Sequence, residues 1–154
     1  MSPFDWAFLP LQRYFTFHGR SPRAEYWWFF LFQALVSIVT TLIDLALELG
    51  GPDSLISTNM LLGLAFLIPS LAVTVRRLHD INRSGWTILI FMVLTIAAIF
   101  VGALLSAVLG GFGTLLLLLG VGAVSVSFII LMATDGNPGA NGYGDHPYGR
   151  SYGC

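Results

Sequence analysis

Hydrophobic residues form four long runs along the chain, and short polar stretches separate them. The runs extend over residues 26–49, 58–75, 86–109 and 112–132. A helix needs about 20 apolar residues, at 1.5 Å per residue, to cross about 30 Å of hydrocarbon. The runs approach or exceed that length, and the alternation typical of a barrel strand is absent. The pattern therefore predicts an all-α membrane protein with four transmembrane helices.

The breaks between the runs predict how the helices follow one another. Gly110 and Gly111 leave only a tight turn between the third and fourth runs, so we expect these helices to be antiparallel neighbours. We treat residues 1–154 as a single integral membrane domain and expect residues 133–154 to form a cytoplasmic tail. Residues 1–20 lack the basic start, short apolar core and small-residue cleavage site of a signal peptide. We therefore expect the first run to stay in the protein.

The segment before the first run is neither a solvated arm nor a span. It carries large apolar side chains such as Phe4, Trp6, Phe8 and Phe15, and Pro10 should interrupt a helix there. We interpret it as an N-terminal interfacial segment that lies on the membrane surface. Packing against the protein's own loops is the alternative.

Composition agrees with a chain that lipid covers. Only 10% of the 154 residues are charged and 56% are hydrophobic, whereas about a quarter of a soluble domain is charged. The net charge of −1 gives no indication of a nucleic-acid partner, and we expect none. Cys154 is the single cysteine, which excludes an intramolecular disulfide.

The arginines predict the orientation. All seven cationic residues are arginines: three precede the first run, three lie between the second and third runs, and one is in the tail. The other two loops contain none. Loops rich in arginine stay in the cytoplasm, so we expect both termini to be cytoplasmic. Trp27, Trp28 and Trp86 would then mark the inner membrane interface.

Three polar clusters are expected on that same side, over residues 17–28, 76–86 and 135–148. Ser21 can cap the first transmembrane helix, and Glu25 suits its first turn. The candidate ligand-binding face consists of Arg20, Arg23, Arg76, Arg77, His79, Arg83 and Trp86. The candidate pairing and loop-organising residues are Glu25, Asp80, Asp135, Asn141 and Asp145.

Two compatible interpretations of these clusters remain open. In the first, the arginines pair with the carboxylates, which neutralises charge at the membrane edge and joins the loops. In the second, the arginines form an anionic site, because guanidinium groups bind phosphate through two parallel hydrogen bonds. Phospholipid headgroups are the nearest phosphates.

Catalytic and metal-binding patterns are weak. His79 and Asp80 are adjacent in sequence and do not face each other on a helix. The sequence has no nucleophile elbow or phosphate loop, and its histidines lack the short spacings of a zinc site. Asp135-Gly136-Asn137 resembles the opening of a calcium loop, but Pro138 follows and no glutamate closes it. We expect no enzyme activity, no metal and no cofactor.

The first run contains a polar stripe at steps of 4, 3, 4 and 4 residues. Its members are Gln33, Ser37, Thr40, Asp44 and Glu48. They share one helix face, which should contact protein or water because polar groups facing lipid are costly. The stripe is interpreted as an interhelical hydrogen-bonding seam or as part of an ion or proton path in an oligomer.

Small residues and a proline mark the other runs. Ala98, Gly102, Ser106 and Gly110 form one ridge of the third run, which suits close packing on the fourth run or a homodimer. Pro69 interrupts the second run and should free the carbonyl of Ala65.

At the three polar clusters the chain resembles a bacterial inner-membrane family, domain of unknown function 805, the YhaH/YhaI-like proteins. The residues that carry the likeness are Phe17, Gly19, Arg20, Arg23, Glu25, Tyr26, Trp27, Phe29, Pro69, Ser70, the run from Arg76 to Asp80, the run from Arg83 to Trp86, Asp135, Gly136, Asn141, Tyr143, Gly144 and Asp145. The likeness covers residues 15–147. Thr87 departs from it, since the family often has a second tryptophan there. The resemblance implies an inner-membrane location and a four-helix fold, and it implies no activity.

The sequence thus favours a non-enzymatic inner-membrane component that binds a partner or an anionic lipid at its arginine-rich face. The alternative is a small oligomeric channel or transporter that uses the polar stripe. Membrane lipids, a membrane-protein partner or a second copy of the chain are the expected partners.

Overall fold

The structure, a computed structural model, describes residues 1–47 and 57–147. Its helices are α1 (Pro3–Gln12), α2 (Arg23–Ala46), α3 (Thr58–Asp80), α4 (Thr87–Leu109) and α5 (Gly111–Ala133). The helices α2 to α5 are long and apolar enough to cross a membrane, and the described residues form no β-strand. The predicted all-α class with four membrane spans is confirmed. The glycine and proline break after the first run lies outside the described residues.

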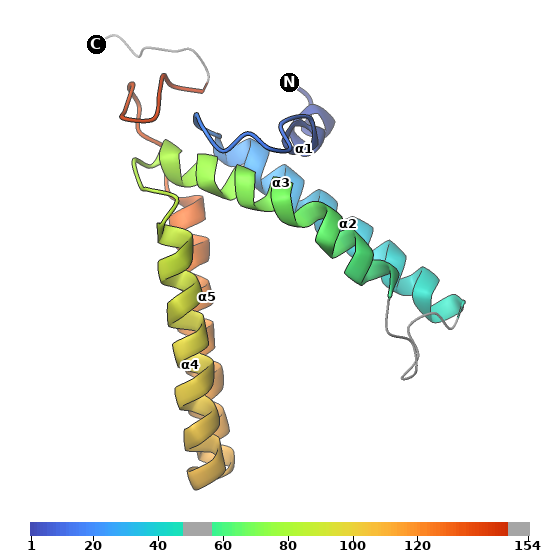
Figure 1. Cartoon of the computed structure of the whole chain (residues 1–154), viewed down its shortest axis with the longest axis vertical. Helices are drawn as coiled ribbons and strands as arrows, with labels where there is room; N and C mark the ends of the chain where they lie inside the picture. The colour runs from blue at the N-terminus through green and yellow to red at the C-terminus, as the bar shows by residue number, and fades with distance from the viewer. Residues whose placement is uncertain (48–56, 148–154) are drawn as a thin grey trace.

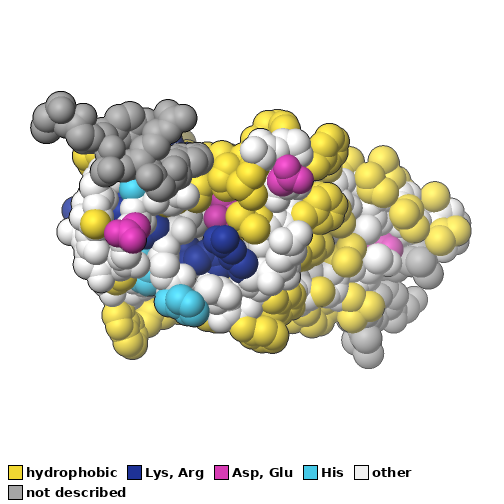
Figure 2. All heavy atoms as spheres, turned by 90° about the horizontal axis from the view of Figure 1, so that it is seen from above, with side chains coloured by type: hydrophobic (Ala, Val, Ile, Leu, Met, Phe, Trp, Pro, Cys, Tyr) yellow, Lys and Arg dark blue, Asp and Glu magenta, His cyan; other side chains and the backbone are white. Residues whose placement is uncertain are grey.

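The four long helices form two hairpins, α2 with α3 and α4 with α5, which diverge from a common end (Figure 1). Most of the close contacts between the described helices lie within each hairpin and around α1, and few join the two hairpins. We call the common end the polar end. It comprises the starts of α2 and α4, the ends of α3 and α5, and residues 13–22, 81–86 and 134–147. Seen from above, this end gathers charged side chains within a frame of hydrophobic ones (Figure 2).

The turn between α4 and α5 consists of Gly110 alone, which adopts a positive φ of 59°. Side chains disfavour this conformation, so a glycine is required there. Beside the turn, the hydroxyls of Ser106 and Thr114 lie 2.8 Å apart and join the two helices. The predicted tight antiparallel hairpin is confirmed.

The ridge of small residues on α4 lies against α5. A Cβ atom added to Gly102 would be 2.6 Å from the Cβ of Leu117, which is too close for any side chain. The helix backbones approach each other closely only because this position is a glycine. The ridge therefore serves packing within the hairpin.

The N-terminal segment contains a helix that Pro10 does not interrupt, so this expectation was wrong. Pro10 lies in the last turn of α1, where the missing N–H affects only one helical hydrogen bond. Ser2 and Asp5 form a capping box at the start, and the Ser2 N–H holds the pKa of Asp5 below its ordinary value. The ring of Phe8 packs against Phe32, 5.0 Å between centroids, and so fixes α1 on α2.

Pro69 lies inside α3, where the absence of its N–H leaves the carbonyl of Ala65 without a helical donor. The hydroxyl of Tyr14 donates to this carbonyl. The predicted free carbonyl exists, and a side chain from the N-terminal segment satisfies it. Residues 13–22 are thereby attached to the middle of α3.

Helix α3 extends to Asp80, five residues beyond the predicted end of the second span at residue 75. The predicted span covers the apolar part of this helix and did not include its polar end. Arg76 and Arg77 continue the helix, and protein groups surround their side chains. This extension generates the site described next.

Candidate functional site

Three arginines are buried at the polar end. Arg20, Arg76 and Arg77 expose 6%, 1% and 0% of their surface, although arginine is almost never fully buried without a partner. Removing a guanidinium from water costs several kcal/mol unless a counter-charge and hydrogen bonds compensate. The position of every group around these three side chains is therefore constrained.

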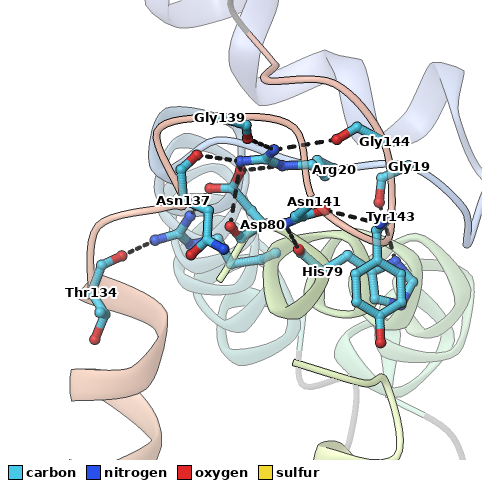
Figure 3. A network of polar contacts seen from close by, with 11 residues as sticks. Gly19, Arg20, His79, Asp80, Thr134, Asn137, Gly139, Asn141, Tyr143 and Gly144 are labelled. Atoms are coloured by element: carbon cyan, nitrogen blue, oxygen red, sulfur yellow. Dashed lines mark hydrogen bonds and ion pairs between the residues drawn. The ribbon is translucent and has the colours of Figure 1, made fainter. Parts of the chain in front are cut away.

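The carboxylate of Asp80 lies between two of these arginines (Figure 3). Its Oδ1 accepts from Arg20, with the Nε at 3.0 Å and the Nη2 at 2.9 Å. Its Oδ2 accepts from Nη1 of Arg77, one turn earlier on α3. One buried carboxylate thus neutralises one of two buried positive charges.

Backbone carbonyls of the C-terminal segment satisfy the rest of the Arg20 guanidinium. Its Nη2 donates to the carbonyl of Asn137 at 2.6 Å, and its Nη1 donates to those of Gly139 at 2.6 Å and Gly144 at 3.3 Å. These carbonyls come from residues 134–147, which surround the arginine as a loop (Figure 3). Arg20 therefore fixes the conformation of this loop.

Arg77 joins the two hairpins. Its Nε donates to the carbonyl of Met132 at 3.1 Å, and its Nη2 donates to that of Thr134. The last carbonyls of a helix have no intrahelical donor, and α5 has no basic residue in its own last turn. An arginine from α3 thus caps the end of α5.

Arg76 joins α3 to the N-terminal part of the chain. Its Nη2 lies 2.6 Å from Glu25 Oε1 of α2, and its Nη1 donates to the carbonyl of Thr16 at 2.5 Å. Glu25 is fully buried. Together, Arg76 and Arg77 bind the end of α3 to the segments on both sides of it.

The end of α3 is capped by groups distant in sequence. The N–H of Ser21 donates to the carbonyl of Arg76 at 3.0 Å, and the N–H of Asn137 donates to that of Asp80 at 2.9 Å. The side chain of Asn141 donates to the carbonyl of His79 at 2.8 Å. Ser21 was predicted to cap α2 with its hydroxyl, which was wrong, because Pro22 holds the N-cap position.

His79 contacts loops rather than a reacting group. Its Nδ1 lies 3.1 Å from the carbonyl of Gly19, and its ring stacks on Tyr143 with 3.9 Å between centroids. Gly136 passes so close to the network that a Cβ there would overlap the Asp80 carboxylate. His79 and Asp80, adjacent in sequence, thus have separate partners.

The remaining residues of the candidate face lie outside this network. Arg23 pairs with Asp135 at 2.5 Å, but the two side chains are 50% and 82% exposed. Arg83 and Asp145 are exposed, and Trp86 exposes 73% of its surface. The structure therefore divides the predicted face into a buried network and an exposed surface.

The polar stripe of α2 faces α3. Gln33 donates to Ser70 at 2.6 Å, and Thr40 donates to Asn59 at 2.6 Å. Ser37 also contacts Asn59, at 3.2 Å. These contacts satisfy three members of the stripe within one hairpin.

The acidic part of the stripe is less completely described. Asp44 exposes 7% of its surface, and its Oδ1 has no hydrogen-bond partner within the described ranges. Glu48 lies outside the described residues. Residues 1–47 and 57–147 contain no group of three His, Cys, Asp or Glu side chains placed to hold a metal ion.

Sequence reasoning missed the backbone partners of the arginines. The carbonyls of Asn137, Gly139, Gly144 and Met132 carry no residue-specific signal, since every residue has one. The glycine-rich composition of residues 135–144 was the available signal, because it leaves carbonyls accessible to a guanidinium. Gly19 and Tyr143 belong to the family likeness, but the sequence pattern predicted no structural role for them.

This fold and this site define a small membrane protein whose apolar hairpins are joined at one end by buried arginines. The family model described as "Protein of unknown function (DUF805)" matches residues 14–145, so the chain belongs to this family. Inner membrane protein YhaI of Escherichia coli strain K12 is 33% identical over 144 residues, 93% of this chain and 95% of YhaI. Inner membrane protein YhaH of the same strain is 36% identical over 91 residues, 58% of this chain and 74% of YhaH. No solved structure shows significant similarity.

Asp80→Asn should strongly destabilise the protein, because it leaves two buried arginines without a counter-charge. Breaking a buried ion pair from one side costs about 3–5 kcal/mol. Thermal unfolding of the detergent-purified protein measures this as a lowered midpoint. Asp135→Asn is the matched control, and its exposed pair with Arg23 should contribute little. Equal midpoints for the two variants would contradict the role given to Asp80.

Proposed function

We propose that this protein is a non-enzymatic component of the bacterial inner membrane that binds anionic phospholipid at its polar end. The supporting observation is the division of the arginines into two sets. Arg20, Arg76 and Arg77 are buried and bonded to protein groups, whereas Arg13 and Arg83 expose their side chains. Exposed arginines at a membrane edge attract phosphate headgroups.

We propose that the polar end faces the cytoplasm. The arginine distribution supports this orientation, because arginine-rich loops are retained on the cytoplasmic side. Ser84→Cys in a Cys154→Ser background should then react with an impermeant maleimide only after cells are permeabilised. Labelling of intact cells would contradict the orientation.

The lipid surface we propose centres on Arg83 and Trp86, which are close in sequence and both exposed. An indole prefers the headgroup region, where its ring meets hydrocarbon and its N–H meets water. Trp86 thus places the neighbouring guanidinium at the depth of the phosphates. Arg13, at the end of α1, supplies a second exposed cation at the polar end.

The channel interpretation has less support. Gln33, Ser37 and Thr40 form hydrogen bonds with side chains of α3, and these bonds support packing of the α2–α3 hairpin. The enzymatic interpretation also has little support, because the carboxylate of Asp80 is fully occupied by two arginines. A binding role requires neither a pore nor a reactive group.

Trp86 can report directly on the nearby lipid. In a variant that retains Trp86 as its only tryptophan, vesicles of brominated phosphatidylglycerol should quench fluorescence more than vesicles of brominated phosphatidylcholine. Arg13→Gln with Arg83→Gln should reduce this difference, and so should raised salt, because exposed charges are screened.

Asp145→Asn is the control for a change of charge at the same end, since Asp145 is also exposed. It should leave the preference for phosphatidylglycerol intact or raise it. Equal quenching by the two lipids in the parent single-tryptophan protein would contradict the proposed function.

A further inference from the structure

The divergence of the two hairpins leaves an apolar groove between them, next to the polar end. Its volume is about 540 Å³, and α2, α4 and α5 all contribute to its wall. Trp27 and Phe30 line it from α2, and Phe91 and Phe128, with ring centroids 5.1 Å apart, line it from α4 and α5. Among the hydroxyls that line the groove, those of Thr95 and Ser125 are bonded to carbonyls of their own helices, and Tyr26 contributes a third. Most of the side chains that line the groove are apolar.

A polar pocket of about 340 Å³ lies one helical turn away. Pro22 and Arg23 line it at the start of α2, and Arg77, Asp135 and His146 line it from other segments. Residues three and four apart lie on one face of a helix, so Arg23 is directly above Tyr26 and Trp27 of the groove. The pocket and the groove are thus consecutive along the same face of α2.

The groove lies within reach of the polar pocket along α2. Phe30 is seven residues from Arg23, or about 10 Å along the helix axis. A lipid whose headgroup occupied the polar pocket could therefore place the first part of an acyl chain in the groove.

The charge at this end favours an anion. In the described part of the chain, three buried arginines, Arg20, Arg76 and Arg77, face two buried carboxylates, Glu25 and Asp80. The two buried carboxylates thus compensate two of these three positive charges. Arg77, which shares Asp80 with Arg20, lines the polar pocket together with Asp80 and the exposed Asp135.

Arg23 is the group best placed to bind a phosphate. Its guanidinium is half exposed, and its partner Asp135 is 82% exposed, so their ion pair contributes little and can be exchanged. Helix α2 also begins here without a side-chain cap, and its partial positive charge adds to that of Arg23. A phosphate would interact favourably with both the Arg23 guanidinium and the N-terminus of α2.

We propose that the groove and the pocket together hold one anionic phospholipid, with an acyl chain against Phe91 and Phe128 and its phosphate beside Arg23. This inference rests on the proposed function and assigns it a specific lipid site, separate from the exposed surface at Arg83 and Trp86.

Native mass spectrometry of the full-length protein in mild detergent tests this site. With phosphatidylglycerol or phosphatidylcholine added, the parent protein should retain one phospholipid and prefer phosphatidylglycerol. Ser125→Phe fills the groove and should lower retention of both lipids about tenfold. Ser127→Phe is the matched control, because Ser127 is also exposed and bonded to its own helix but does not line the groove. It should retain lipid as the parent does.

Arg23→Gln tests the headgroup half of the site. It should remove most of the preference for phosphatidylglycerol while an acyl chain still enters the groove. Unchanged retention in Ser125→Phe, equal loss in Ser127→Phe, or an unchanged preference in Arg23→Gln would each overturn the inference. A dimer that disappears in Ser125→Phe would overturn it too, since a second copy would then occupy the groove.

The two proposals fail in different ways. If the groove variants behave as the parent while quenching at Trp86 still prefers phosphatidylglycerol, only the groove site is wrong. If quenching at Trp86 shows no preference, the exposed surface is wrong whatever the retained lipid does.

Discussion

The carboxylate of Asp80, shared between Arg20 and Arg77, is the interaction on which the arrangement of this protein depends. It lies at the end of α3, where the chain segments before α2 and after α5 meet. Because both arginines are buried, neither can exchange this partner for water. Their remaining donors are directed to the carbonyls of Asn137, Gly139 and Thr134. The buried charges of the arginines must be compensated, and this requirement fixes contacts between segments more than 100 residues apart in the sequence.

The apolar parts of the protein constrain the arrangement of the two hairpins much less. In the most hydrophobic stretches of α4 and α5 only 6% of the residues are fully buried, so much of the surface of this hairpin is left for lipid to cover. Lipid tails are as apolar as these side chains, and no hydrophobic force draws the two hairpins together. The hairpins diverge from the polar end (Figure 1), and we infer that the polar network sets the angle between them. This divergence opens the groove that we assign to a phospholipid.

The membrane spans were predictable because lipid imposes a long apolar run on any helix that crosses it. The Gly110 turn and the Gly102 contact were predictable for a similar reason, since each requires a glycine. The position at which α3 ends was not predictable, because the burial of Arg76 and Arg77 depends on segments that are far away in the sequence. The three polar clusters were recognisable in the sequence, but the separation of their arginines into a buried and an exposed set was not visible. That separation depends on the path of residues 134–147, where glycines allow many conformations and the arginines select one.

The angle between the hairpins tests the central role of this network most directly. Spin labels at Leu42→Cys in α2 and Leu118→Cys in α5, in a Cys154→Ser background, lie toward the ends of the hairpins away from the network. In reconstituted vesicles, double electron–electron resonance should give a narrow distribution of long distances between them. Asp80→Asn should broaden it, while labels at Val101→Cys and Leu118→Cys within the α4–α5 hairpin should be unaffected. Short distances typical of a compact four-helix bundle, or a distribution that Asp80→Asn leaves unchanged, would contradict the role of the buried arginines.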